Sequence, residues 1–160
     1  GDDILAEITL DLRDHQFDRP PISQTLEAQF GDNIRLLGYD LENDTSRPNG
    51  ELQLTLYWQA IRQPTVGYTV FNHVVSADGQ MQGQFDSPPV GDAWLTTTWL
   101  PDEIVIDKRT IPIRPNAMPG RHDLIIGLYN ASDGQRLPVL FDGQQLSGDQ
   151  LTLTSVVVQP

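Results

Sequence analysis

The sequence predicts an all-β fold: an antiparallel β-sandwich of two sheets, immunoglobulin-like or jelly-roll-like, with about nine or ten strands. The 160 residues include 13 glycines and 12 prolines. Turn signals recur roughly every 8 to 15 residues, which is typical of sandwiches and barrels. Between the turns, apolar and polar residues alternate as in half-buried strands. No long segment carries the apolar stripe of a helix.

The first predicted strand, at residues 4–12, alternates apolar and polar side chains. The connector that follows ends in Arg19-Pro20-Pro21, which cannot continue a ladder because proline lacks an N–H. The next two strands flank a turn at Gly31-Asp32. The strands after the connector are predicted at 25–30, 33–41, 51–59, 68–75, 81–85, 103–113, 121–129, 136–141 and 150–158.

The turns between these strands have their own signatures. Residues 42–50 form a polar loop. Residues 77–80 and the pair Asp133-Gly134 are hairpin signals. Residues 86–101 contain too many prolines for a strand and are too long for a tight turn, so we expect them to wrap an edge of the sandwich and bury Trp94 or Trp99.

One strand shows which face is the core. In residues 51–59, Leu52, Leu54, Leu56 and Trp58 share one face, and the opposite face is polar except for a tyrosine. We expect the first face to be core and the second to be wet or covered by a loop. The chain is predicted to be a single domain over 1–160, with a leading strand and connector at 1–22 and the sandwich body at 25–158.

The composition excludes several classes of function. The net charge is -12, from 22 acidic and 10 basic residues. An acidic chain is a poor partner for phosphate backbones and anionic lipids, so we expect no nucleic-acid binding. No apolar run approaches the length of a membrane span, so we expect no direct membrane insertion. The absence of cysteine excludes disulfides, thiol nucleophiles and thiolate zinc sites.

We expect no enzymatic activity in this chain. The histidines His15, His73 and His122 fall in a connector, a central strand and a strand start, where a structural role is the expected one. The sequence contains no nucleophile elbow, zinc-protease motif, phosphate-binding loop or dinucleotide fingerprint. The alternative is an enzyme with a deep pocket near His73 or His122.

The residues suggest two kinds of binding site, one for calcium and one for a sugar. Oxygen ligands for calcium gather around the 42–50 loop, although without a recognised spacing; the candidates are Asp40, Glu42, Asp44 and Glu51. Our expectation is no cofactor, with a structural calcium as the alternative.

The second kind of site is a sugar-binding groove in which exposed rings stack on sugar faces and polar side chains bind hydroxyls. The candidate ligand-binding residues are Tyr57, Trp94, Trp99, Asp86 and Arg109. Tyr57 and Trp94 are the rings expected to be exposed. The interpretation we favour is that Trp58 and Trp99 are core anchors, because large aromatic rings are usually buried.

Seven phrases of the sequence form a recognisable series. They are FGDNIRLLGYDL (30–41), LTLYWQA (54–60), YTVFNH (68–73), DSPP (86–89), TWLP (98–101), Gly127-Leu128-Tyr129 and RLPV (136–139). Together they resemble the C-terminal β-sandwich tail domain of bacterial membrane glycosyltransferases that are similar to the dolichyl-phosphate-mannose mannosyltransferases. The resemblance covers roughly residues 28–139. One departure is Asp102, where the family has glycine, which should change only a turn.

This resemblance implies a location on the extracytoplasmic side of a bacterial membrane, tethered through the parent chain. The implied partner is an upstream membrane-embedded part of the same chain. The expected function is that of a non-catalytic accessory module, with a glycan as a further candidate ligand. Two alternatives stay open: a structural or protein-interaction domain without a small ligand, and a free secreted carbohydrate-binding module.

Overall fold

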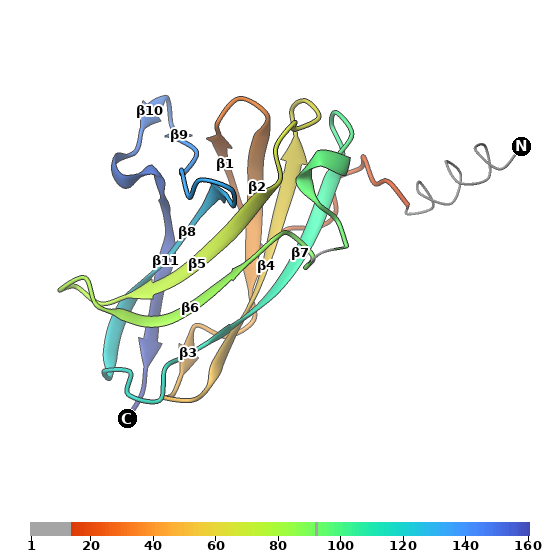
Figure 1. Ribbon diagram of the computed structural model, residues 1–160. Coiled ribbons are helices and arrows are strands. Elements are labelled where there is room, and N and C mark those ends of the chain that lie inside the picture. The colour runs from red at the N-terminus through yellow and green to blue at the C-terminus, as the bar shows by residue number, and fades with distance from the viewer. Residues whose placement is uncertain (1–13, 92) are drawn as a thin grey trace, which may run out of the picture.

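The computed structural model describes residues 14–91 and 93–160, and these form a sandwich of two sheets (Figure 1). The six-stranded sheet contains, in spatial order, β10 (Gln144–Gln145), β9 (Val139–Phe141), β1 (Gln24–Phe30), β2 (Ile34–Leu41), β4 (Glu51–Ala60) and β7 (Ile104–Pro112). The five-stranded sheet contains β3 (Thr45–Ser46), β11 (Leu151–Val158), β8 (Gly120–Asn130), β5 (Tyr68–Val75) and β6 (Met81–Ser87). The all-β prediction is therefore confirmed.

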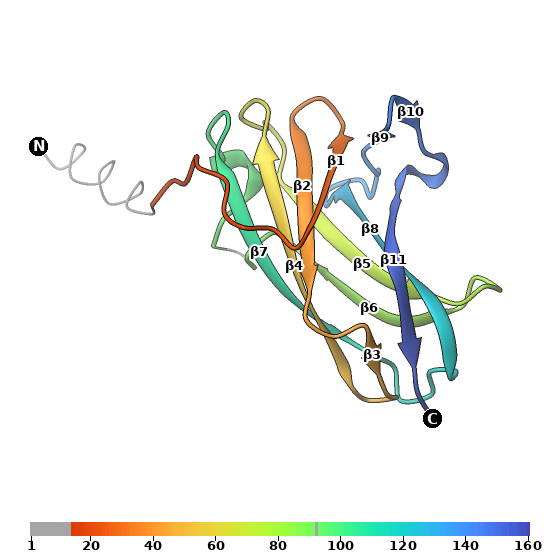
Figure 2. The same ribbon diagram turned by 180° about the vertical axis from the view of Figure 1, so that it is seen from behind.

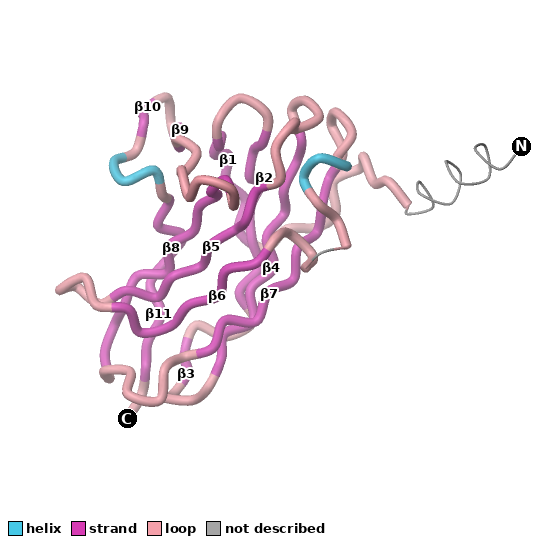
Figure 3. The backbone as a smooth tube through the Cα atoms, viewed as in Figure 1, coloured by secondary structure: helices cyan, strands magenta, loops and turns pink. Residues whose placement is uncertain are grey.

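Helix is confined to two short 3-10 turns in the described residues, η1 (Thr96–Thr98) and η2 (Ser147–Asp149) (Figure 3). No helix among these residues has the length and apolarity needed to cross a bilayer. The strand predicted at 4–12 lies outside the described residues.

Two local predictions need correction. The 42–50 loop contains the short strand β3, which pairs with β11 in parallel, whereas we expected antiparallel pairing throughout. The pairing is possible because the loop lies alongside the end of β11, where the Val157 N–H donates to the Asp44 carbonyl at 2.8 Å and the Gln159 N–H donates to the Ser46 carbonyl at 2.8 Å.

The second correction concerns the hairpin predicted at Asp133-Gly134. The chain does turn there, and Arg136 forms a single bridge with Tyr129 of β8. It then leaves that sheet, and the following residues become β9 beside β1 in the other sheet. Pro138 stands at the crossing, where it lacks the N–H needed to extend the first ladder, while its carbonyl accepts from the Gly31 N–H at 2.9 Å.

The core lies between the sheets, and β4 supplies much of it. Leu52, Leu56 and Trp58 are completely buried, as the alternation predicts. The Trp58 ring meets the ring of Phe30 edge to face, with 5.3 Å between centroids. The face of β4 that was expected to be core is therefore confirmed.

The connector covers the opposite face of β4, as Figure 2 shows. Its Ile22 packs on Leu37, Tyr57 and Ile104, which form a second apolar cluster outside the main core. The start of the connector is held at β7, because Gln16 forms a bridge with Ile104. At its end the Ser23 N–H donates to Asp40 Oδ1 at 2.7 Å. Of the two outcomes we allowed for this face, covering by a loop is the one observed.

The two sides of the sandwich differ. On one side β6 and β7 lie together, joined by a bridge between Gly83 and Ile113 and by a bond from the Arg114 N–H to the Gln82 carbonyl at 2.8 Å. We call this the closed side. On the other side, β1 with β9 and β11 with β3 are the facing edges (Figure 2). We call this the open side.

Candidate functional site

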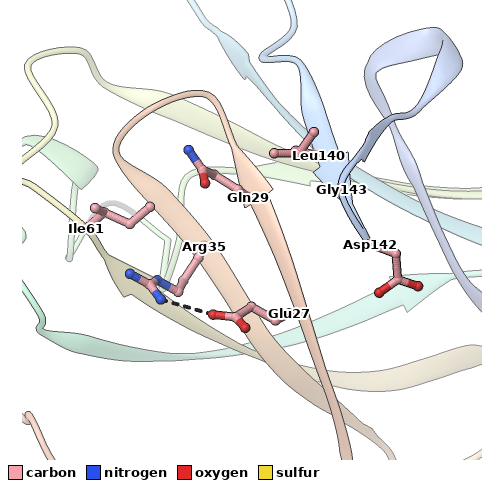
Figure 4. A pocket seen from close by; sticks show the side chains of 7 residues that line it. All are labelled: Glu27, Gln29, Arg35, Ile61, Leu140, Asp142 and Gly143. Atoms are coloured by element: carbon pink, nitrogen blue, oxygen red, sulfur yellow. Dashed lines mark hydrogen bonds and ion pairs between the residues drawn. The ribbon is translucent and has the colours of Figure 1, made fainter.

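A groove of about 430 Å³ lies on the outer face of the six-stranded sheet. It is formed by the β1–β2 hairpin, the residue after β4, and β9 with its following turn (Figure 4). Its lining residues are Glu27, Gln29, Arg35, Ile61, Leu140, Asp142 and Gly143. The volume falls within the range of small-molecule sites, and several polar side chains converge on it.

Arg35 carries the positive charge of the groove. Its Nη1 lies 3.0 Å from Glu27 Oε1, across the hairpin (Figure 4). Its Nε is buried and has no hydrogen-bond partner among the described residues. Because this Nε is shielded from solvent, a ligand in the groove would contact the partly exposed remainder of the Arg35 side chain.

The remaining polar groups of the groove are mostly acceptors. Asp142 occupies the left-handed region at φ 51°, followed by Gly143 at φ 75°, in the tight turn that brings its carboxylate to the groove. Glu27 is largely exposed, so its carboxylate is open to solvent and to a ligand. Two carboxylates and one guanidinium in the same groove suit hydroxyl groups, which donate to the former and accept from the latter.

Leu140 gives the groove an apolar surface. Its side chain is 44% exposed, which is unusual for a leucine in a strand of this sheet. A smaller hollow of about 180 Å³ adjoins the groove, because Leu140 and Gln29 line both. The smaller hollow extends the surface toward Gly31 and Pro138.

The ligand-binding residues predicted from the sequence do not come together. Tyr57 was expected to be exposed, and this is wrong: it is only 6% exposed, beneath the connector. Its hydroxyl donates to Asp40 Oδ2. Burial, reinforced by Asp40, raises the pKa of the phenol to about 12, so Tyr57 stays a neutral donor.

Arg109 also cannot serve a surface groove, because it lies between the sheets. Its Nη1 is 2.9 Å from Asp107 Oδ2, and its Nη2 donates to the carbonyls of Val70 and Ser87. Its Nε donates to Asn72 Oδ1, and its guanidinium lies over the ring of Phe85.

Burial governs the ionisation of this internal pair. It raises the pKa of Asp107, an effect opposed by the charge of Arg109 and by hydrogen bonds. Burial likewise lowers the pKa of Arg109, and Asp107 opposes that shift. Both groups are fully engaged within the fold, so Arg109 ties the two sheets together.

The tryptophans are mainly structural. Trp99 is completely buried, and its Nε1 donates to the Trp94 carbonyl at 3.0 Å. Trp58 is also completely buried, and its Nε1 donates to Asp107 Oδ2 at 3.3 Å. The favoured interpretation, that Trp58 and Trp99 are core anchors, is confirmed. Trp94 is half-buried against the core, as part of the segment that wraps the edge.

Asp86 lies elsewhere again, on the outer face of the five-stranded sheet. It accepts from the Tyr129 hydroxyl at 3.2 Å, and its Oδ1 lies 3.6 Å from His73 Nε2. Burial lowers the pKa of His73, while the charge of Asp86 opposes this shift. Tyr57, Arg109 and Asp86 therefore occupy three separate environments.

The calcium candidates do not form a ligand set. Asp40 is occupied by Ser23 and Tyr57, and Glu51 Oε1 accepts from Gln53 Nε2 at 3.0 Å. Glu42 and Asp44 are exposed in the loop. Within residues 14–91 and 93–160, no three histidine, aspartate or glutamate side chains are placed to hold a metal ion.

The sequence analysis missed the groove residues Glu27, Gln29, Arg35 and Asp142. A signal existed for three of them, because the turn at Gly31-Asp32 fixes the hairpin and pairs Gln29 with Arg35. Asp142 could not be found in this way, since it reaches the groove only because the chain crosses between sheets at Pro138.

Comparison with known proteins identifies a fold. No family model and no curated protein matches this chain. Among solved structures, the C-terminal domain of Wzt is similar over 89% of this chain and 83% of its own, with a TM-score of 0.53 at 10% identity. The CARDB domain of the PF1109 protein from Pyrococcus furiosus, solved with di-metal ions, covers 89% of this chain and 98% of its own at 11% identity, with a TM-score of 0.38.

The Wzt match supports the coarser part of the expected resemblance, the β-sandwich fold. At 10% identity the match is one of fold. The link to glycosyltransferases stays an expectation, since no family model matches.

Proposed function

We propose that this chain is a non-catalytic accessory module that contacts a glycan through the groove of Figure 4. The carrying observation is the Arg35–Glu27 ion pair in a groove that Asp142 and the exposed Leu140 also line. Sugar hydroxyls both donate and accept, so they match this mixture of groups. Leu140 and Ile61 supply apolar contact for the C–H faces of a sugar ring.

A non-catalytic role is supported by the contacts of the three histidines, which lie within the fold. His122 Nε2 lies 2.7 Å from the Met118 carbonyl, and His15 Nδ1 lies 2.7 Å from Glu103 Oε2. His73 packs against Phe71, with 4.7 Å between ring centroids. No histidine lines the groove of Figure 4 or the smaller hollow beside it.

The groove is tested by calorimetric titration with a panel of neutral oligosaccharides, because the buried tryptophans make poor reporters. We expect Arg35→Gln to weaken binding of any responding sugar by about ten-fold or more, the effect of losing a charge-assisted hydrogen bond. Arg121→Gln is the matched control, since Arg121 is an exposed arginine in the other sheet. Absence of binding across the panel, or equal losses in both variants, would contradict the proposal.

We further propose that the module belongs to a membrane glycosyltransferase-like protein and faces the extracytoplasmic side. This rests on the sequence resemblance and on the acidic surface, which suits neither nucleic acid nor anionic lipid. Its test is the coding sequence upstream of Gly1. Several long hydrophobic spans there would agree with a tethered tail. A signal peptide alone would favour the free secreted carbohydrate-binding module instead.

A further inference from the structure

The open side exposes two partly unpaired strand edges. β9 covers β1 only at residues 28–30, so residues 24–27 have no neighbouring strand on that side within the described chain. β3 covers β11 only at Val157 and Val158. Residues 151–156 of β11 are therefore unpaired on their outer edge in the structure as described.

The direction of the outer backbone groups follows from the β3 contact. The Val157 N–H donates to the Asp44 carbonyl at 2.8 Å, away from β8. Because N–H groups alternate along a strand, the Ser155 N–H points the same way. The Leu153 carbonyl is already engaged, since it accepts from the hydroxyl of the buried Tyr39 at 3.4 Å. The Ser155 N–H is the outward donor that can pair with an added strand.

Two grooves give an added strand room along β11. One, of about 400 Å³, includes Thr154 of β11 and Gln24 of β1. The other, of about 380 Å³, includes Leu151 and Thr152. These two grooves share no residue with the groove of Figure 4, so the unpaired edge is a separate surface.

The sequence of β11 leaves this edge unprotected. Its residues, LTLTSVVV, include no proline and no charge, and most are good strand formers. β7, on the closed side, carries the only lysine of the chain, Lys108, and ends at Pro112. Lysine and proline are common devices against pairing with foreign strands. β11 has neither residue type, but it has a bulge between Thr152 and Thr154, so the regular part of its free edge is residues 154–156.

The groove of about 400 Å³ beside β11 is acidic, and this charge favours a cationic partner. Glu42 and Asp44 line it, and no arginine or lysine does. A second copy of this chain would bring the same carboxylates and a net charge of -12. We propose that the β11 edge is a strand-addition site for an extended polypeptide segment that carries lysine or arginine, whose backbone pairs with β11 and whose cations face Glu42 and Asp44.

The probe is a fluorescent nine-residue peptide of alternating valine and lysine, with the valine–glutamate peptide as its counterpart. Binding is followed by anisotropy, and protection of the Ser155 amide by hydrogen exchange. We expect the lysine peptide to bind and to protect this amide, and the glutamate peptide not to bind. Ser155→Pro removes the outward donor, and we expect it to raise the Kd at least ten-fold.

Glu42→Gln with Asp44→Asn provides an independent test, because both side chains are exposed and their loss leaves the edge intact. We expect a weaker complex with a smaller salt dependence, whereas the control Asp102→Asn, at an exposed carboxylate just before β7 on the closed side, should have no effect. If Ser155→Pro bound the lysine peptide as tightly as the unchanged protein, the interaction would be general charge attraction and the proposal would be wrong. The proposal would also be wrong if the lysine peptide did not bind at all, or if the protein self-associated through this edge and Ser155→Pro abolished that self-association.

Discussion

The closed and open sides of the sandwich show two ways of ending a sheet. On the closed side, β6 and β7 join directly, and the buried guanidinium of Arg109 binds carbonyls of β5 and β6. On the open side, β1 and β11 are capped only by short strands, and the nearby grooves are lined with polar side chains. The closed side holds the sheets together, whereas the open side leaves strand edges without a neighbour in the described residues, and recognition there and in the nearby groove is our proposal.

The largest expected loss of stability comes from a substitution on the closed side. Arg109→Met would leave the Asp107 carboxylate buried without its cation, and we expect a loss of about 3–5 kcal/mol in the free energy of unfolding. Adding Asp107→Leu should recover part of this loss, because no buried charge remains. Urea denaturation measures both. A loss below about 1 kcal/mol for the single variant would show that the pair is not needed.

The next prediction compares neighbouring positions of β11. The Thr154 N–H faces β8, so Thr154→Pro removes a ladder hydrogen bond and should cost about 3 kcal/mol. Ser155→Pro removes only an outward donor, and we expect a cost below about 1 kcal/mol. Chemical denaturation of the two variants checks this. Equal costs would mean that the outer edge of β11 is paired and the open side is not open.

A smaller effect is expected where β6 approaches β7. A Cβ atom on Gly83 would lie 2.8 Å from the Pro112 carbonyl oxygen, so Gly83→Ala must move the two strands apart. We expect a cost of about 1–3 kcal/mol, as for other overpacked sites. Gly79→Ala is a poor control because its φ is 85°, whereas Gly67 is open and has no such strain. If Gly83→Ala were as stable as Gly67→Ala, the close contact would be absent.

The smallest effect concerns pH and the outer face of β5 and β6. Burial lowers the pKa of His73 below its ordinary value, against the attraction of Asp86, and Arg136 also lowers it. The unfolded chain, with an imidazole pKa of about 6.5, therefore takes up a proton first as the pH falls. Stability should be fully present above this pH and decrease below it. His73→Gln should flatten this part of the profile, and an unchanged slope in urea midpoints between pH 5 and 8 would contradict the assignment.

The alternating strands could be predicted because the core imposes a period of two. The bounds of β5 are those expected, and Leu52, Leu54 and Leu56 are core residues as expected. The roles of Tyr57 and Arg109 could not be read in this way. Tyr57 is on the outward face of its strand, and only the long-range placement of the connector buries it. Arg109 is a charged residue on an inward face, where its burial depends on Asp107 and on carbonyls of β5 and β6.

The groove of Figure 4 could likewise be predicted only in part from the sequence. Gln29 and Arg35 are paired by a local turn that the sequence indicates, but Leu140 and Asp142 arrive by a crossing between sheets. The expectation of exposed aromatic rings led to the wrong residues, because large rings are needed first for the core. Polar groups that line a sheet face are individually unremarkable in a sequence, and only the fold brings them together.

The most direct test of recognition at the groove of Figure 4 is a nuclear magnetic resonance titration of the isotope-labelled chain with the neutral oligosaccharide panel. We predict saturable shifts for amides of β1, β9 and the turn at Asp142-Gly143, with those of β6 and β7 unchanged. In Arg35→Gln these shifts should saturate only at about ten-fold higher sugar concentration. Titrations without shifts, or shifts centred on His73 and Asp86 in the other sheet, would contradict the account.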